Sequence, residues 1–139
     1  MEKVNRLIKF RAWDLKEKVM YQDVVVSQWG VQYIRGHDIE FVTDWGIRYF
    51  RMQFTGLFDK NGKEIYEGDI LNMTYRDDVK KEEPRNLSIT WKEPIKGVVK
   101  FENAGFFVGD EFVLLGKIGR SLEVIGNIYE NPELLESEK

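Results

Sequence analysis

Apolar and polar residues alternate along most of this chain with the two-residue period of a β-strand that buries one face. The pattern is clearest where single polar residues separate Phe50, Met52 and Phe54. It predicts a strand with these three side chains in the core and with Arg51 and Gln53 in solvent. Similar apolar segments occur at residues 8–13, 19–26, 98–101, 106–108, 112–115 and 122–128. The chain is therefore expected to fold mainly from strands.

Turn residues separate these segments at short intervals. At residues 59–62, an aspartate that can bond to its own backbone precedes an Asn-Gly pair that adopts positive φ at low cost. We predict a tight reversal there and a second turn at residues 67–69. Near the C-terminus, Asn131, Pro132 and Glu133 predict the start of a brief helical turn. The expected fold is all-β or β-dominated: a bent antiparallel sheet or small barrel built from hairpins, with a short C-terminal helical turn.

Three motifs in the chain resemble a known family. Residues 55–57, Thr-Gly-Leu, and residues 59–70, Asp-Lys-Asn-Gly-Lys-Glu-Ile-Tyr-Glu-Gly-Asp-Ile, resemble the signature of the YopX family of phage and prophage proteins. Residues 9–14, Lys-Phe-Arg-Ala-Trp-Asp, resemble its opening, and residues 124–132 resemble its close. The resemblance implies a single YopX-like domain over residues 1–139, small and β-rich, and it brings no assigned catalytic residue.

Composition favours a packed and soluble protein. Of the 139 residues, 42% are hydrophobic, 14% are aromatic and 32% are charged, which is typical of a globular domain. The chain has no cysteine, so disulfides, thiolate metal sites and cysteine nucleophiles are excluded. No apolar run approaches the roughly 20 residues that span a bilayer, and no signal peptide is recognised. We expect the cytoplasm of a bacterial host as its location.

One segment, at about residues 74–93, differs in character from the rest. Residues 76–85 carry four charges of each sign and almost nothing apolar, so they cannot supply a core face. We predict a mobile, exposed excursion here. A solvated loop is favoured over a partner-binding arm or a lid.

Residues 27–35 and 43–51 match in type almost position by position at an offset of 16 residues. Each copy contains a Trp-Gly pair, with Trp29 in the first and Trp45 in the second. One interpretation makes the two indoles a stacking platform for bases or a peptide. The favoured interpretation is that two hairpins reuse one turn design and pack both indoles on the core. The sequence does not decide whether these indoles are buried or exposed.

The sequence contains no recognisable catalytic motif. No serine lies in a Gly-x-Ser-x-Gly elbow, and turn chemistry explains the single histidine, His37. Phosphate-binding and dinucleotide-binding glycine motifs are absent, so no cofactor is expected. Glu64, Glu67 and Asp69 are the best metal-binding candidates because hard cations prefer several oxygen ligands. Ordinary hairpin and turn roles explain them better, so we expect neither a metal site nor an enzyme.

The remaining candidates are surface residues for binding. Lys9, Arg11, Trp13 and Arg51 would combine positive charge with an aromatic ring on the wet face of a sheet, as in small barrels that bind oligonucleotides. A net charge of −3 favours an ordinary solvated face instead. The preferred hypothesis is a non-enzymatic phage or prophage accessory protein that binds a host or phage protein or associates with itself as a homo-oligomer. The alternatives are a nucleic-acid-binding module and, less favoured, a metal-dependent enzyme.

Overall fold

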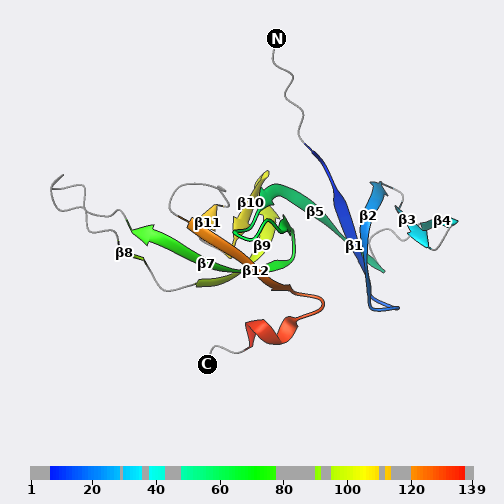
Figure 1. The fold of residues 1–139 in the computed structure, drawn as a ribbon. Coiled ribbons are helices and arrows are strands. Elements are labelled where there is room, and N and C mark those ends of the chain that lie inside the picture. Colours follow the sequence, from blue (N-terminus) through cyan, green and yellow to red (C-terminus); the bar gives the residue numbers. More distant parts are fainter. Residues whose placement is uncertain are drawn as a thin grey trace, which may run out of the picture. The chain divides into compact units, whose positions relative to one another are not determined.

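The computed structural model describes residues 7–28, 30–35, 38–42, 48–77, 90–91, 95–109, 112–113 and 120–136. Within these ranges the fold consists of strands and one short 3-10 helix, and the strands form two antiparallel sheets (Figure 1). The β-dominated class predicted from the alternation of residue types is therefore confirmed. The strands of the described ranges form open sheets and do not close into a barrel.

The first sheet is a meander with two further strands added to one side. Its strands are β1 (Phe10–Asp14), β2 (Val19–Ser27), β3 (Gly30–Arg35), β4 (Asp38–Val42), β5 (Tyr49–Phe58) and β6 (Glu64–Tyr66). They follow the order β4-β3-β2-β1-β5-β6. β1 therefore has a hydrogen-bonded neighbour on each side.

The second sheet is arranged around one central strand. Its strands are β7 (Asp69–Asp77), β8 (Thr90–Trp91), β9 (Ile95–Glu102), β10 (Gly105–Val108), β11 (Phe112–Val113) and β12 (Arg120–Asn127). The order is β11-β10-β9-β7-β12, and β8 pairs with β7 off this path. β7 lies between β9 and β12, so its first residues are paired on both sides.

The chain divides into two compact units, Met1–Gly56 and Leu57–Lys139. β5 runs from the first unit into the second, and Gly56, at the boundary, has a φ of 88° that favours glycine. Each unit has its own apolar core. In the first unit it consists of Ala12, Val24, Val31, Tyr33 and Tyr49. In the second unit it consists of Ile65, Leu71, Met73, Val99, Val108 and Leu122.

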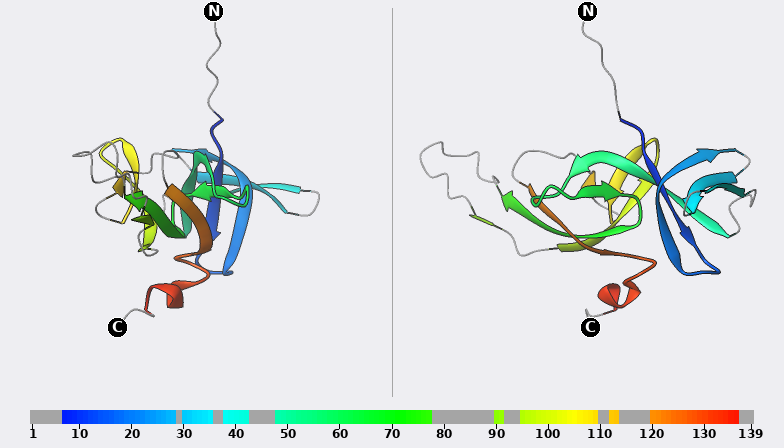
Figure 2. Two further views of the ribbon diagram at one scale, coloured as in Figure 1. Left: turned by 60° about the vertical axis from the view of Figure 1, so that its left-hand side comes forward. Right: turned by 45° about the vertical axis from the view of Figure 1, so that its right-hand side comes forward.

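The sheet of the first unit is strongly bent (Figure 2). β3 and β5 are separated by β2 and β1 in the sheet order, yet the hydroxyls of Tyr33 and Tyr49 lie 3.4 Å apart. The two tyrosine side chains meet across the concave face of this curled, open sheet. Tyr33 and Tyr49 are equivalent positions in the repeat of 16 residues seen in the sequence. The bend predicted from the hairpin pattern is present, and the repeat supplies its central contact.

The C-terminal helical turn is η1 (Pro132–Leu135), with the proline and the early acid where the sequence placed them. The expected N-cap bond from Asn131 is not made. Its side-chain oxygen instead accepts the Asn127 N–H at 3.2 Å. No helix in the described part of the chain is long and apolar enough to cross a membrane.

Candidate functional site

The signature turn, residues 59–63, connects β5 to β6 and is built around the Asp59 carboxylate. One oxygen of this carboxylate accepts the N–H groups of Asn61 and Lys63 at 2.8 and 2.9 Å. The Gly62 N–H donates to the Asp59 carbonyl at 3.0 Å, and Gly62 has a φ of 83°. A three-residue loop that ends in a left-handed glycine is a common hairpin connection. The predicted reversal is present, with only the glycine of the Asn-Gly pair at positive φ.

The signature turn also reaches β12. The second Asp59 oxygen accepts the Val124 N–H at 3.0 Å, and the Lys60 N–H donates to the Leu122 carbonyl at 2.9 Å. The Lys60 ammonium lies 3.3 Å from the Glu123 carboxylate. β12 pairs with β7 along its other side. The turn therefore occupies the outer edge of β12.

The environment of Asp59 keeps it ionised. Burial of this carboxyl would raise its pKa, but the N–H groups of Val124, Lys63 and Asn61 outweigh that effect and hold the pKa below the usual 3.8. Asp59 is only 7% exposed. At neutral pH both its oxygens are therefore hydrogen-bond acceptors, which is what the three donors require.

The turn between β6 and β7 is organised in the same way by Asp69. Its Oδ2 accepts the Tyr66 N–H at 2.8 Å, and the residue is 1% exposed. The Gly68 N–H donates to the Val99 carbonyl, and the Gly68 carbonyl accepts the Ile128 N–H, each at 2.9 Å. This turn therefore connects β9 with the segment that follows β12.

The closing motif holds that following segment. The Asn127 side-chain oxygen accepts the N–H groups of Tyr129 and Glu130 at 3.0 and 2.9 Å, and its Nδ2 donates to the Glu130 carboxylate at 2.8 Å. A Cβ atom on Gly126 would lie 2.6 Å from Asn131 Oδ1. The closing motif thus forms a turn in which the absence of a side chain at Gly126 lets the Asn131 side chain approach closely.

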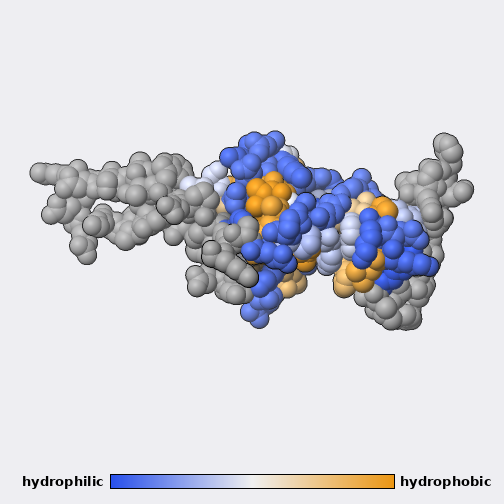
Figure 3. Space-filling model, turned by 90° about the horizontal axis from the view of Figure 1, so that it is seen from below, coloured by the Kyte–Doolittle hydropathy of each residue, from blue (hydrophilic) through white to orange (hydrophobic). Residues whose placement is uncertain are grey.

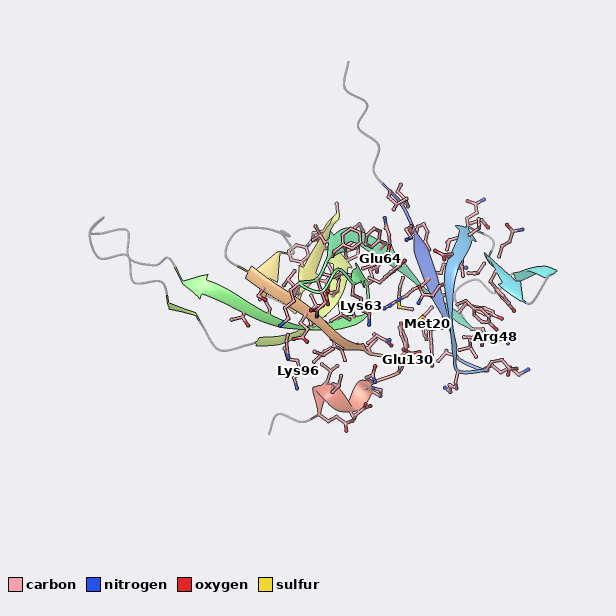
Figure 4. All side chains as sticks on the ribbon, in the orientation of Figure 1. Met20, Arg48, Lys63, Glu64, Lys96 and Glu130 are labelled. Atoms are coloured by element: carbon pink, nitrogen blue, oxygen red, sulfur yellow. The ribbon has the colours of Figure 1, made fainter. Side chains whose placement is uncertain are left out.

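Lys96, on β9, caps the end of η1. Its Nζ donates to the Leu134 carbonyl at 2.9 Å, and Figure 4 shows Lys96 extending toward the helical turn. The last carbonyls of a helical segment lack partners within the segment, and a cation there is favourable. Lys96 is therefore used in positioning the C-terminal segment.

The three predicted metal candidates have separate roles. Asp69 bonds to the backbone of its own turn, while Glu64 and Glu67 are half-buried on β6 and in the turn after it. Over the ranges that the structure describes, no group of three Asp, Glu or His side chains is arranged to hold a metal ion. The structure does not bring these carboxylates together as a ligand set.

In the first unit, Arg48 and the buried Asp14 form an ion pair with two hydrogen bonds. Arg48 Nε and Nη2 each lie 2.9 Å from one of the two Asp14 oxygens. The N–H groups of Lys16 and Glu17 also donate to Asp14, at 2.9 and 3.2 Å. Arg48 and these N–H groups outweigh burial and lower the pKa of Asp14 from 3.8 to about 2. The carboxylate in turn raises the pKa of Arg48.

A group of tyrosines lies next to this ion pair. The Arg48 guanidinium is 5.1 Å from the centre of the Tyr49 ring, and Tyr21 stacks on Tyr33 with ring centres 4.1 Å apart. Burial raises the pKa of Tyr49, so its phenol keeps its proton. The pairing of Arg48 with Asp14 joins the residue just before β5 to the end of β1.

Two of the four predicted surface residues are buried. Arg11 and Trp13 are each 6% exposed, so placing Arg11 on a wet face was wrong. Ala12 between them is also buried. β1 has neighbours on both sides and buries residues that point to both of its faces. Alternation identifies a wet face only where one exists, and this central strand has none.

The other two predicted surface residues are half-buried. Lys9 places its ammonium 5.6 Å from the centre of the Phe54 ring, and Arg51 lies opposite Ala12 in the β1–β5 register. Lys9, Arg11, Trp13 and Arg51 therefore do not form an exposed basic patch.

An aromatic pair on the β9–β10 hairpin is the strongest candidate for a binding surface. Phe101 is 50% exposed, and its ring packs against that of Phe106 at 5.0 Å. The pairs Phe101–Phe106 and Val99–Val108 lie on the same face of the hairpin, and Val99 and Val108 are core residues. The core-facing row thus continues past the end of the core and leaves Phe101 uncovered.

Other large apolar side chains reach solvent at scattered positions. They are Leu7, Ile8, Leu15, Val19, Val25, Phe50, Phe58 and Leu135. On the face seen in Figure 3, apolar residues emerge in separate patches bordered by hydrophilic ones. Scattered exposure of this kind is common. Phe101 differs because it continues an apolar row from the core, a feature that the sequence pattern of a hairpin does not reveal.

Several predictions fall on residues outside the described ranges, namely those for Trp29, Trp45, His37 and residues 78–89 and 92–94. The described ends of the predicted charged excursion are strands, because β7 extends to Asp77 and pairs there with β8. Residues 74–77 and 90–91, which were predicted to belong to the excursion, are therefore strand residues.

Comparison with known proteins agrees with the motifs. The chain is similar to the crystal structure of protein EF1440 from Enterococcus faecalis, with a TM-score of 0.60 and 30% sequence identity, over 94% of this chain and 99% of that one. No curated protein matches. The profile of the YopX protein family matches residues 9–136, which contain all three motifs. The chain belongs to the YopX family.

Proposed function

We propose that this protein is a non-enzymatic accessory protein of a phage or prophage that binds another protein in the host cytoplasm, with Phe101 and Phe106 at the contact. The exposure of Phe101 carries the proposal. Removing such a ring from water favours association, and a few aromatic side chains commonly dominate the binding energy of an interface. The core below the β9–β10 hairpin holds this pair in place before any partner binds.

Nucleic-acid binding has less support because two cations that could meet phosphate are used within the fold or buried. Arg48 is paired with Asp14 at two points, and Arg11 is buried. The net charge of −3 adds no long-range attraction.

Catalysis has less support for a related reason. A general acid or base works best with a pKa near the operating pH. Hydrogen bonds within the fold lower the pKa values of both Asp14 and Asp59, and so move them further from neutral pH. These carboxylates act as fixed acceptors.

The proposal is tested by capturing partners from a lysogen lysate, with and without nuclease. The tagged proteins compared are the natural chain, F101S and V25S. F101S should retain at least about tenfold less partner than the natural protein does, because the substitution removes a central aromatic contact. V25S is the matched control, since Val25 is 61% exposed but belongs to the other unit. Equal retention by F101S and V25S, or retention that disappears with nuclease, would contradict a protein-binding surface at Phe101.

A further inference from the structure

The outer edge of β12 is covered by an element that is not a strand. The Leu122 carbonyl and the Val124 N–H flank Glu123 and both point away from β7. These are two of the groups that a neighbouring strand would use in pairing with β12. Here Lys60 supplies the donor from its backbone, and Asp59 supplies the acceptor from its side chain. The signature turn therefore substitutes for a neighbouring strand with one N–H and one carboxylate.

An uncovered edge strand presents free N–H and C=O groups that pair readily with another chain. β12 has eight residues, and its pairing with β7 extends from Arg120 to Asn127. It is long enough to template a further strand. A second copy of β12 would fit this edge in antiparallel orientation, centred on Glu123, because the outward groups of Leu122 and Val124 would then be exchanged between the copies.

We propose that the signature turn is an autoinhibitory edge cap that prevents β12 from pairing with β12 of a second copy of this chain. The cap depends on the backbone N–H of Lys60 and on the carboxylate of Asp59. It acts independently of the surface at Phe101, which lies on β9 at a different place in the sheet order.

Glu123 adds a second barrier to the same association. In a pair centred on this residue, the two Glu123 side chains would lie directly opposite each other, and like charges in that position are unfavourable. In the capped state this carboxylate is 3.3 Å from the Lys60 ammonium. A test of the cap therefore has to remove this charge in variant and control alike.

The variants follow from the geometry. The open-edge variant combines K60P, which removes the donor to Leu122, with D59A, which removes the acceptor for Val124. Proline suits position 60, because this is the second position of the reversal closed by Gly62. K60A is the matched control, since it keeps the backbone N–H and loses only the side chain.

Cross-linking reads out the association. The natural chain has no cysteine, so E123C adds a single thiol to each background. In the pair of β12 strands, residue 123 of one copy would lie opposite residue 123 of the other as a non-hydrogen-bonded pair. Their Cα atoms would be about 4.5 Å apart, within the range that a disulfide spans. Under mild oxidation the open-edge variant with E123C should form a covalent dimer. The K60A protein with E123C should remain monomeric.

In dilute protein without E123C, where the chains are monomeric, amide hydrogen exchange at Val124 shows whether the edge has opened. Exchange there should be about tenfold faster in the open-edge variant than in K60A. Equal cross-linking in the two backgrounds would overturn the proposal. So would an open-edge variant that shows no covalent dimer, or unchanged exchange at Val124. If D59A prevents folding, K60P with E123C keeps the cross-linking comparison with K60A intact, because it removes the donor to Leu122 while the Asp59 carboxylate still organises the turn.

Discussion

Single side chains in this protein replace hydrogen bonds that the backbone does not make with itself. Asp59 accepts three N–H groups, from its own turn and from β12, and Asp69 accepts that of Tyr66. Asn127 accepts two N–H groups in the last turn. A buried donor without a partner costs free energy, so these short polar residues determine whether the turns form.

The first prediction concerns Asp59. In D59N an amide that has only one accepting oxygen replaces two oxygens that serve three donors. At least one N–H group then loses its acceptor, and the free energy of unfolding should fall by about 1–3 kcal/mol. Urea unfolding measures this change, with K60A as a control expected within about 0.5 kcal/mol of the natural protein. Equal stability of D59N and K60A would show that these bonds contribute nothing.

The second prediction concerns the ion pair of Asp14 and Arg48. The pKa of Asp14 is about 2 when folded and 3.8 ordinarily, so protonation favours the unfolded chain. The stabilisation is complete above pH ~4 and disappears as the pH falls toward ~2. The natural protein should thus exceed R48A in stability at neutral pH, with a difference that shrinks in acid. K16A keeps its N–H donor and should follow the natural protein. A difference between natural protein and R48A that does not depend on pH would refute the assignment.

At the scale of elements, the sequence predicted the hairpins but not the faces of every strand. The alternation at residues 50–54 identified β5, in which Met52 and Phe54 are buried, but Phe50, also expected in the core, is exposed. The same reasoning failed at β1, because one of its two neighbours, β5, comes from a distant part of the sequence and pairs with the edge that β2 leaves free. Turn chemistry is encoded locally, whereas burial of both faces is decided by which strands assemble around a central one.

The candidate site shows the same division. The acceptor role of Asp59 within its own turn follows from residues 59–63, but its bond to Val124 joins positions 65 residues apart. The exposure of Phe101 likewise depends on where the core ends. Both features arise from packing between elements and leave no mark in a local pattern.

The third prediction concerns the C-terminal turn. In G126A the new Cβ atom would lie 2.6 Å from Asn131 Oδ1 and 2.8 Å from Leu134 Cδ1, so the side chains of Asn131 and Leu134 must shift away from β12. The cost should be about 1–3 kcal/mol, as is usual for overpacking. Faster amide exchange at Ile128 would report the movement. G105A is the control, because its nearest contact would be an ordinary 3.6 Å. Unchanged exchange in G126A would refute this packing.

At the scale of the whole molecule, the family profile and the similar crystal structure extend across both compact units. The single domain expected from the sequence stays a prediction. It has a physical basis in β5, which runs from one unit into the next as one strand of one sheet. A strand shared in this way couples the unfolding of its two ends.

The fourth prediction follows from that coupling. D59N lies in the second unit, and a single cooperative domain requires that it accelerate the slowest amide exchange in both units by the same factor. The Tyr33 amide reports on the first unit and the Leu71 amide on the second. Faster exchange at Leu71 alone would show that the two units unfold separately.

In this protein the residues of the family signature form hydrogen bonds that build the fold, and we propose that Phe101 contacts the partner. The most direct measurement is the affinity of one captured partner for F101S and for D59N, at a temperature where both are folded. We predict that F101S weakens binding at least about tenfold with little change in stability, and that D59N binds as the natural protein does despite being less stable. Weakened binding by folded D59N together with full binding by F101S would contradict the account.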